Sequence, residues 1–228
     1  SRALRSERCP KISRRIFSIA SRSCRIIASA LVGAAKNVPG LPVWGSVRSI
    51  APSRYDAGTA YLTVDFHQVD NRDPFVYKTS DLGKTWKKIG LDSSQHISRI
   101  LVDPKNPNIV FVAAQGALYS RSKERGVYKS IDGGATWKSV LYVDDKTGAA
   151  ELSMDMTNPR ILYAAMWEHG RLPWKVISGG PGSGLYKSTD NGETWEKLKD
   201  GLPEELGKMA IAVSRSNPEK VYALIESD

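Results

Sequence analysis

Cysteine is scarce in this sequence of 228 residues, and the two cysteines lie close to one end. Both Cys9 and Cys24 fall within the first 36 residues. The chain from residue 37 onward therefore holds neither a disulfide nor a cysteine-based metal site. Histidine is almost as scarce: His67, His96 and His169 are far apart in the sequence and follow no metal-ligand spacing. We therefore expect no bound metal and no cofactor.

Long apolar runs are also missing, and the basic charge is confined to one segment. No stretch reaches the roughly 18 apolar residues that a membrane-spanning helix needs. The net charge is +9, but nine of the 33 basic residues and only one of the 24 acidic residues lie in residues 1–36. The remaining chain is nearly neutral, which argues against a nucleic-acid-binding face.

Residues 1–36 form a basic leader with three open interpretations. Arg22 and Arg25 precede a short apolar stretch, residues 26–35, that ends in small residues and resembles a secretory signal. A long Arg/Ser-rich segment before it and the initial Ser favour a disordered or mistranslated extension instead. The third interpretation is a functional basic tail. In each case we expect the leader to pack poorly on residues 37–228 and to be removed by limited proteolysis.

A ten-residue pattern occurs three times. The copies share Tyr-Lys-[Ser/Thr]-x-Asp-x-Gly-x-Thr-Trp and occupy residues 77–86, 128–137 and 186–195. They lie about 50 to 60 residues apart, a period typical of propellers and other repeat folds. The Asp, Gly and Trp positions of the three copies are Asp81, Gly83, Trp86, Asp132, Gly134, Trp137, Asp190, Gly192 and Trp195.

A second pattern recurs in phase with the first. It is an Asn-Pro turn between apolar runs, and it is found at residues 102–113, 154–165 and 213–224, with a degenerate copy at 51–62. Two patterns in constant phase indicate one structural unit that repeats along the chain.

Each period contains four strand-like segments. In one period they are residues 97–102, 109–113, 126–130 and a segment that begins at Trp137. Four short antiparallel strands describe a propeller blade. The expected fold is therefore all-β: a β-propeller of four-stranded antiparallel blades over residues 37–228. With about three and a half blades it is incomplete, so we expect the remaining blades of the same propeller as a partner.

The ten-residue pattern has the chemistry of a tight turn. An Asp carboxylate accepts hydrogen bonds from nearby backbone N–H groups, and Gly adopts positive φ without a Cβ clash. The Trp ring supplies apolar area for packing between blades. We therefore interpret Asp81, Asp132 and Asp190 as structural and not as catalytic carboxylates.

These residues resemble the Asp-box, or BNR repeat, of sialidases, sortilin-type receptors and xyloglucan-hydrolysing propellers. With the in-phase Asn-Pro turns and the long segments at 167–174 and 178–184, residues 41–228 look most like secreted microbial BNR-repeat glycosyl hydrolases with a sortilin-like N-terminal propeller. The resemblance implies a secreted or periplasmic location. It is specific for fold and less so for activity, because one fold hosts many functions.

Strand order places the long loops on the face opposite the Asp-boxes. The connections between second and third strands are the long, variable loops at residues 65–75, 115–125 and 167–184, and we expect the glycine-rich residues 179–184 of the last to be a flexible segment that leads into the third strand. The candidates for glycan binding in this loop are Trp167, His169, Arg171 and Trp174, with Glu168 as the candidate catalytic carboxylate. Further polar residues expected on this face are Asp65, His67, Asp70, Arg72, His96, Arg121, Glu124, Asp144, Asp145 and Glu151.

Two function classes stay open. One is a glycoside hydrolase or glycan-binding protein, as the family resemblance implies. The other is a non-catalytic propeller that binds a protein or peptide, as sortilin-type receptors do. The Asp-boxes do not discriminate between the two classes because their role is structural.

Overall fold

The computed structural model describes residues 46–56, 58–65, 73 and 75–227. The basic leader, His67, Asp70 and Arg72 lie outside the described residues. Every regular element among the described residues is a β-strand, as the sequence predicted. The described residues contain no helix that is long and apolar enough to cross a membrane.

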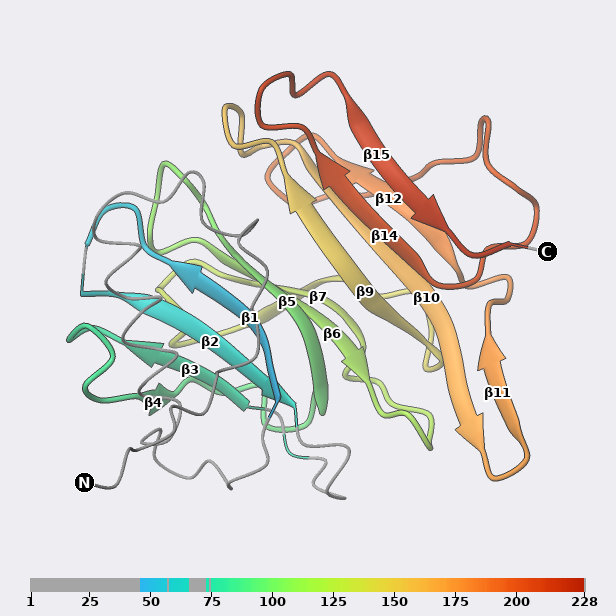
Figure 1. The fold of residues 1–228 in the computed structure, drawn as a ribbon, viewed down its shortest axis with the longest axis horizontal. Helices are drawn as coiled ribbons and strands as arrows, with labels where there is room; N and C mark the ends of the chain where they lie inside the picture. The colour runs from blue at the N-terminus through green and yellow to red at the C-terminus, as the bar shows by residue number, and fades with distance from the viewer. Residues whose placement is uncertain (1–45, 57, 66–72, 74, 228) are drawn as a thin grey trace, which may run out of the picture.

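The strands form three blades and a two-stranded sheet that lie side by side (Figure 1). Blade 1 consists of β1 (Ser46–Pro52), β2 (Ala60–Asp65), β3 (Phe75–Thr79) and β4 (Lys87–Lys88). Blade 2 consists of β5 (His96–Val102), β6 (Val110–Gly116), β7 (Gly126–Ser130) and β8 (Lys138–Leu141). All neighbouring strands are antiparallel.

Blade 3 has one strand more than the other two. It consists of β9 (Thr147–Met154), β10 (Leu162–Leu172), β12 (Gly184–Ser188) and β13 (Glu196–Lys197), with β11 (Lys175–Ser178) paired to the far end of β10. The last sheet pairs β14 (Met209–Val213) with β15 (Val221–Ile225). These observations confirm the all-β fold of four-stranded antiparallel blades.

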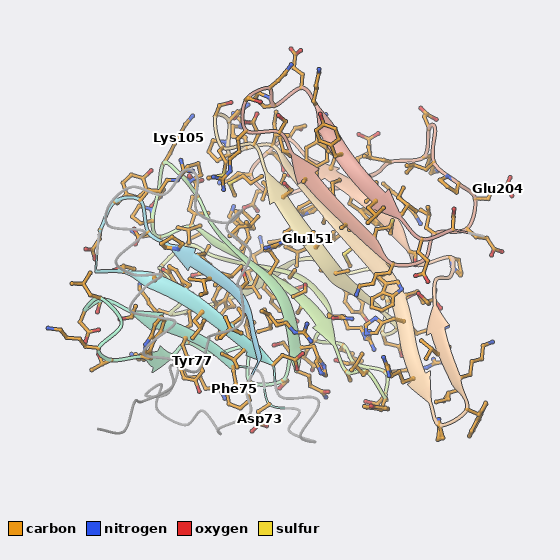
Figure 2. All side chains as sticks on the ribbon, viewed as in Figure 1. Asp73, Phe75, Tyr77, Lys105, Glu151 and Glu204 are labelled. Atoms are coloured by element: carbon orange, nitrogen blue, oxygen red, sulfur yellow. The ribbon has the colours of Figure 1, made fainter. Side chains whose placement is uncertain are left out.

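The apolar cores lie between successive blades because strand side chains alternate between two faces. In β6, Val110 and Val112 pack against the blade 1 side, whereas Phe111 and Ala113 pack against blade 3. Polar contacts also join the blades: Glu151 on β9, labelled in Figure 2, accepts a hydrogen bond from Arg99 Nη2 on β5 at 2.6 Å. Each inner strand thus stabilises two interfaces.

The Asp-box turns lie at the β3–β4, β7–β8 and β12–β13 connections. In the second box, Asp132 Oδ1 accepts the Thr136 N–H at 2.9 Å and Oδ2 accepts the Thr136 hydroxyl at 2.6 Å. The Ser130 hydroxyl donates to Asp132 at 2.7 Å and accepts the Gly134 N–H at 2.8 Å. The same bonds recur in the other two boxes. The invariant Ser/Thr, Asp, Gly and Thr of the pattern are therefore all used inside one turn.

One sequence-based expectation is corrected by the fold. Residues 167–184 are not one long loop between two strands: β10 continues to Leu172, turns at Pro173 and Trp174, and returns as β11. The register pairs Leu172 with Lys175, so the turn has only two residues. This hairpin projects beyond the body of blade 3 (Figure 1).

Candidate functional site

The β10–β11 hairpin carries all five of the glycan-site candidates, but it divides them into two groups. The first group, Trp167, Glu168 and His169, is buried where β10 still packs between neighbouring elements. The second group, Arg171 and Trp174, lies on the exposed end of the hairpin. The structure therefore does not bring the five side chains into a single exposed cluster.

Trp167 is part of the interior and is only 9% exposed. Its ring stacks on His169, with centroids 4.5 Å apart and planes 18° from parallel, and the Lys208 ammonium lies 5.2 Å from the Trp167 centroid. Stacking on a sugar needs an open ring face. The ring faces of Trp167 are covered by His169 and Lys208, which does not suit the glycan-binding role expected for this residue.

Glu168 anchors the glycine-rich segment that precedes β12. Its Oε2 accepts the Gly182 N–H at 3.0 Å, and its backbone N–H donates to Ser183 Oγ at 3.0 Å. A Cβ on Gly180 would lie 2.4 Å from Glu168 Oε2, so this segment can lie over the carboxylate only without a side chain there. The carboxylate also lies 3.9 Å from Lys146 Nζ.

A second carboxylate, Asp144, reaches the same segment. Its Oδ2 lies 3.0 Å from the position that a Cβ on Gly182 would take. Burial raises the pKa of Asp144, but hydrogen bonds from the Lys146 and Thr147 N–H groups outweigh burial and leave the pKa below its ordinary value. A glycosidase general acid needs a raised pKa, so Asp144 is unsuited to that role.

A buried arginine that the sequence analysis did not single out lies beside His169. Arg125 is 1% exposed, and its guanidinium donates to the carbonyl oxygens of Gln115 at 3.0 Å and Ser120 at 3.1 Å, and to that of Ala117. Its Nη1 lies 3.2 Å from His169 Nδ1. Burial, together with the Arg125 charge, lowers the pKa of His169 to about 4, so this imidazole is neutral near pH 7.

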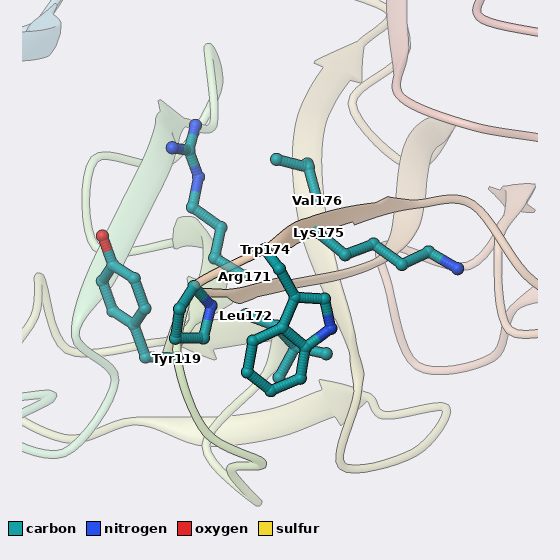
Figure 3. Close-up of a pocket in the computed structure, with 7 residues that line it drawn as sticks. Tyr119, Arg171, Leu172, Trp174, Lys175 and Val176 are labelled. Atoms are coloured by element: carbon teal, nitrogen blue, oxygen red, sulfur yellow. The ribbon is translucent and has the colours of Figure 1, made fainter.

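The exposed end of the hairpin forms a hollow of about 370 Å³ with the β6–β7 connection. Figure 3 shows Tyr119, Arg171 and Trp174 among its lining side chains. Trp174 is 80% exposed and Tyr119 is 55% exposed, so both offer ring surface to a ligand. A hydrogen bond of 2.8 Å from the Arg171 N–H to the Leu118 carbonyl holds the two connections together.

A second hollow of about 370 Å³ adjoins the first, since Tyr119, Arg171 and Leu172 line both. It extends toward Glu168 and His169. Tyr119 was missed in the sequence because an isolated tyrosine in a long connection carries no motif. Its place at the hollow depends on the hairpin of the next blade.

Of the remaining polar candidates, Arg121 lines the second hollow, whereas Glu151 lies on β9 and bonds Arg99 of the preceding blade. His96 Nδ1 lies 3.0 Å from the Gly116 carbonyl, and His96 Nε2 lies 3.6 Å from Asp65 Oδ1. Arg121 and Asp145 form a surface ion pair at 3.7 Å. Within the part of the chain that the structure describes, no three His, Cys, Asp or Glu side chains gather in a way that could hold a metal ion.

Comparison with known families and proteins agrees with this architecture. A BNR/Asp-box repeat model matches residues 186–197. A xyloglucanase of Paenibacillus sp is 25% identical over 174 residues, which cover 65% of this chain and 16% of the relative. A xyloglucanase of Hypocrea jecorina is 25% identical over 217 residues, covering 81% and 23%. The photosystem II assembly lipoprotein Ycf48 of Trichormus variabilis is 27% identical over 146 residues, covering 55% and 42%.

Two solved structures share the fold. An ancestral GH74 enzyme has a TM-score of 0.56 and 19% identity, covering 78% of this chain and 22% of that chain. The GH74 enzyme of Niastella koreensis has a TM-score of 0.51 and 20% identity, covering 78% and 28%. This chain therefore spans less than half the length of each relative named here.

Proposed function

We propose, from the premise that this chain is built of BNR/Asp-box repeats in the blades of a β-propeller, that it binds a glycan chain at the β10–β11 hairpin. The observation that carries the proposal is the 80% exposed Trp174 indole beside the 55% exposed Tyr119 ring at one hollow. Sugar rings present apolar C–H faces that stack on exposed aromatic rings, and Arg171 supplies hydrogen-bond donors for their hydroxyl groups.

The expected ligand class is an extended polysaccharide with little charge. Two of the relatives are xyloglucanases by name, and stacking is the interaction that a neutral glucan backbone offers. A shallow surface on a projecting hairpin suits an extended chain better than a small enclosed ligand. Such a ligand is extracellular, so we place the protein outside the cytoplasm, secreted or periplasmic.

Binding is better supported than hydrolysis at this position. Glycoside hydrolysis in most families needs two carboxyl groups about 5–10 Å apart, one of them protonated at working pH. Here Glu168 is engaged by the Gly182 N–H, and the pKa of Asp144 is lowered. We therefore assign this hairpin a binding role. A hydrolytic activity would need an acid and a base other than Glu168 and Asp144.

The test compares three single variants in affinity electrophoresis of the 228-residue chain through gels containing xyloglucan, other β-glucans or no polysaccharide. Trp174→Ala and Tyr119→Ala should each weaken retardation by at least about tenfold in Kd, equivalent to about 1.4 kcal/mol. Tyr222→Ala is the matched control, because Tyr222 is a 64% exposed tyrosine on β15 that lines neither hollow. Equal retardation of all three variants, or no retardation of the parent chain by any glycan, would overturn the proposal.

A second candidate function is peptide binding, and one observation favours it. Among the described strands, β11 pairs with β10 alone, and its four residues are exposed, so its outer edge offers backbone groups to an extended peptide. The match to the Ycf48 lipoprotein is compatible with a non-hydrolytic role. Retention of the chain by a displayed peptide library, with no retardation by any glycan, would favour this candidate over the first.

A further inference from the structure

A lysine from blade 1 reaches across to the Asp-box turn of blade 2. Lys78 Nζ donates to the Gly133 carbonyl at 3.1 Å and lies 5.4 Å from the centroid of the Tyr61 ring. The Tyr61 hydroxyl donates to the same carbonyl at 3.2 Å. Lys78 is the second residue of the ten-residue pattern, and Gly133 directly follows the box aspartate.

The equivalent residues make the same contact between blades 2 and 3. Lys129 Nζ donates to the Asn191 carbonyl at 2.8 Å and lies 5.7 Å from the centroid of the Phe111 ring. An ion pair of 2.6 Å with Glu193 strengthens this contact. The contact is thus a repeated feature of the interface, and the lysine of the pattern serves the next blade.

The turn is shaped to receive this lysine. The residue after the box aspartate has positive φ, 70° for Gly133 and 66° for Asn191, and its N–H is bonded within its own blade, to Asn108 or Arg160. Its carbonyl is therefore left to face the preceding blade.

The following glycine completes the fit. A Cβ on Gly134 would lie 2.7 Å from Ile89 Cδ1, and one on Gly192 would lie 2.7 Å from Phe111 Cε1. Only a residue without a side chain lets the turn approach the preceding blade this closely. The contact between blades therefore requires glycine at the second position after the box aspartate.

Blade 3 has a lysine and an aromatic ring at the equivalent positions. Lys187 Nζ lies 5.8 Å from the centroid of the Tyr163 ring, and both side chains are half-buried. Tyr163 supplies the hydroxyl that Tyr61 uses in blade 1, and Leu198 holds the position of Ile89. Among the residues that the structure describes, Lys187 Nζ has no hydrogen-bond acceptor.

We propose that Lys187 and Tyr163 form a docking site for the Asp-x-Gly turn of a further Asp-box hairpin. The hairpin would pair with the edge of β15 that no described strand covers, and it would place the carbonyl after its aspartate on Lys187 Nζ and the Tyr163 hydroxyl. This site is separate from the β10–β11 hairpin, so its test does not depend on glycan binding.

The experiment adds such a hairpin to the full chain. A second copy of residues 126–141 is joined by a flexible linker after residue 228, and Lys187→Met is introduced with and without this addition. Lys187→Met should leave the urea midpoint of the 228-residue chain unchanged. In the extended chain, Lys187→Met should lower the urea midpoint by the same amount as Lys78→Met lowers it in the 228-residue chain. Lys175→Met, on the exposed β11, should change neither chain.

A second measurement does not depend on stability. Acetylation of Lys187 by a water-soluble acylating reagent, followed by mass spectrometry, should be at least tenfold slower in the extended chain than in the 228-residue chain. Replacing the copied box aspartate with Ala should restore the faster rate. Equal acetylation rates in both chains, or protection of Lys187 in the 228-residue chain through self-association, would overturn the proposal.

Discussion

The two hairpin tryptophans should respond to truncation in opposite ways, because one is interior and the other is at the surface. Trp167→Ala removes a 9% exposed indole that stacks on His169 and lies under Lys208. Replacing a buried Trp with Ala usually costs about 3–5 kcal/mol. Within the described residues the Trp167 Nε1–H has no acceptor, so removing it relieves part of an unpaired-donor penalty of about 1–3 kcal/mol.

The net loss expected for Trp167→Ala is therefore about 2–4 kcal/mol. With an m-value of about 4 kcal/mol per M in guanidinium chloride, the unfolding midpoint should fall by about 0.5–1 M. Trp174→Ala, at an 80% exposed position, should shift the midpoint by no more than about 0.1 M. Trp167→Phe keeps an aromatic ring without the unpaired N–H and should cost less than Trp167→Ala.

The assay is equilibrium denaturation of the parent and the three variants, followed by circular dichroism. The same samples are tested for glycan retardation. Trp174→Ala should lose glycan binding while its unfolding midpoint stays unchanged, whereas Trp167→Ala should have a lowered unfolding midpoint. Equal midpoint shifts for the two alanine variants would refute the division of the hairpin into a packed part and a recognition part.

Three further predictions concern titration and turn geometry. Hydrogen bonds lower the pKa of Asp81 to about 2 from about 3.8, so its stabilising effect is present above pH 4 and is lost as the pH falls toward 2; the Tm difference between the parent and Asp81→Ala should shrink over that range. The pKa of His169 is lowered from about 6.5 to about 4, so the unfolded chain takes up the proton first and stability falls between pH 6.5 and 4; His169→Asn should flatten the Tm profile there. Gly134→Ala should destabilise by about 2–4 kcal/mol in chemical denaturation, because positive φ adds to a clash with Ile89. Gly201→Ala, with positive φ but open space, should cost only about 1–2 kcal/mol, and equal losses would contradict the clash.

The sequence by itself determined the blades, because the signals that specify them are local. Every side-chain hydrogen bond inside the second Asp-box joins residues two or four positions apart, so Ser130, Asp132, Gly134 and Thr136 carry the turn in their spacing. Alternation along the inner strands and the in-phase Asn-Pro turns then imply four strands per period.

Only the tertiary structure decided which candidates face a ligand. The turn at Pro173 and Trp174 lacks the Asn-Gly or Asp-Gly chemistry that marks two-residue hairpins, so the sequence offered no sign that β10 continues and returns. Trp167 and Trp174 are the same residue type in one segment, and their exposure depends on what packs against each.

The contact between the buried Arg125 and His169 side chains and the contacts that join the blades are long-range in sequence. Arg125 and His169 are 44 residues apart, and Lys129 and Asn191 are 62 residues apart. Such pairs depend on how whole blades pack, and packing is set by the shapes of two surfaces that no local pattern describes. The sequence therefore specified the repeating unit, and the assembly of blades determined where its side chains can act.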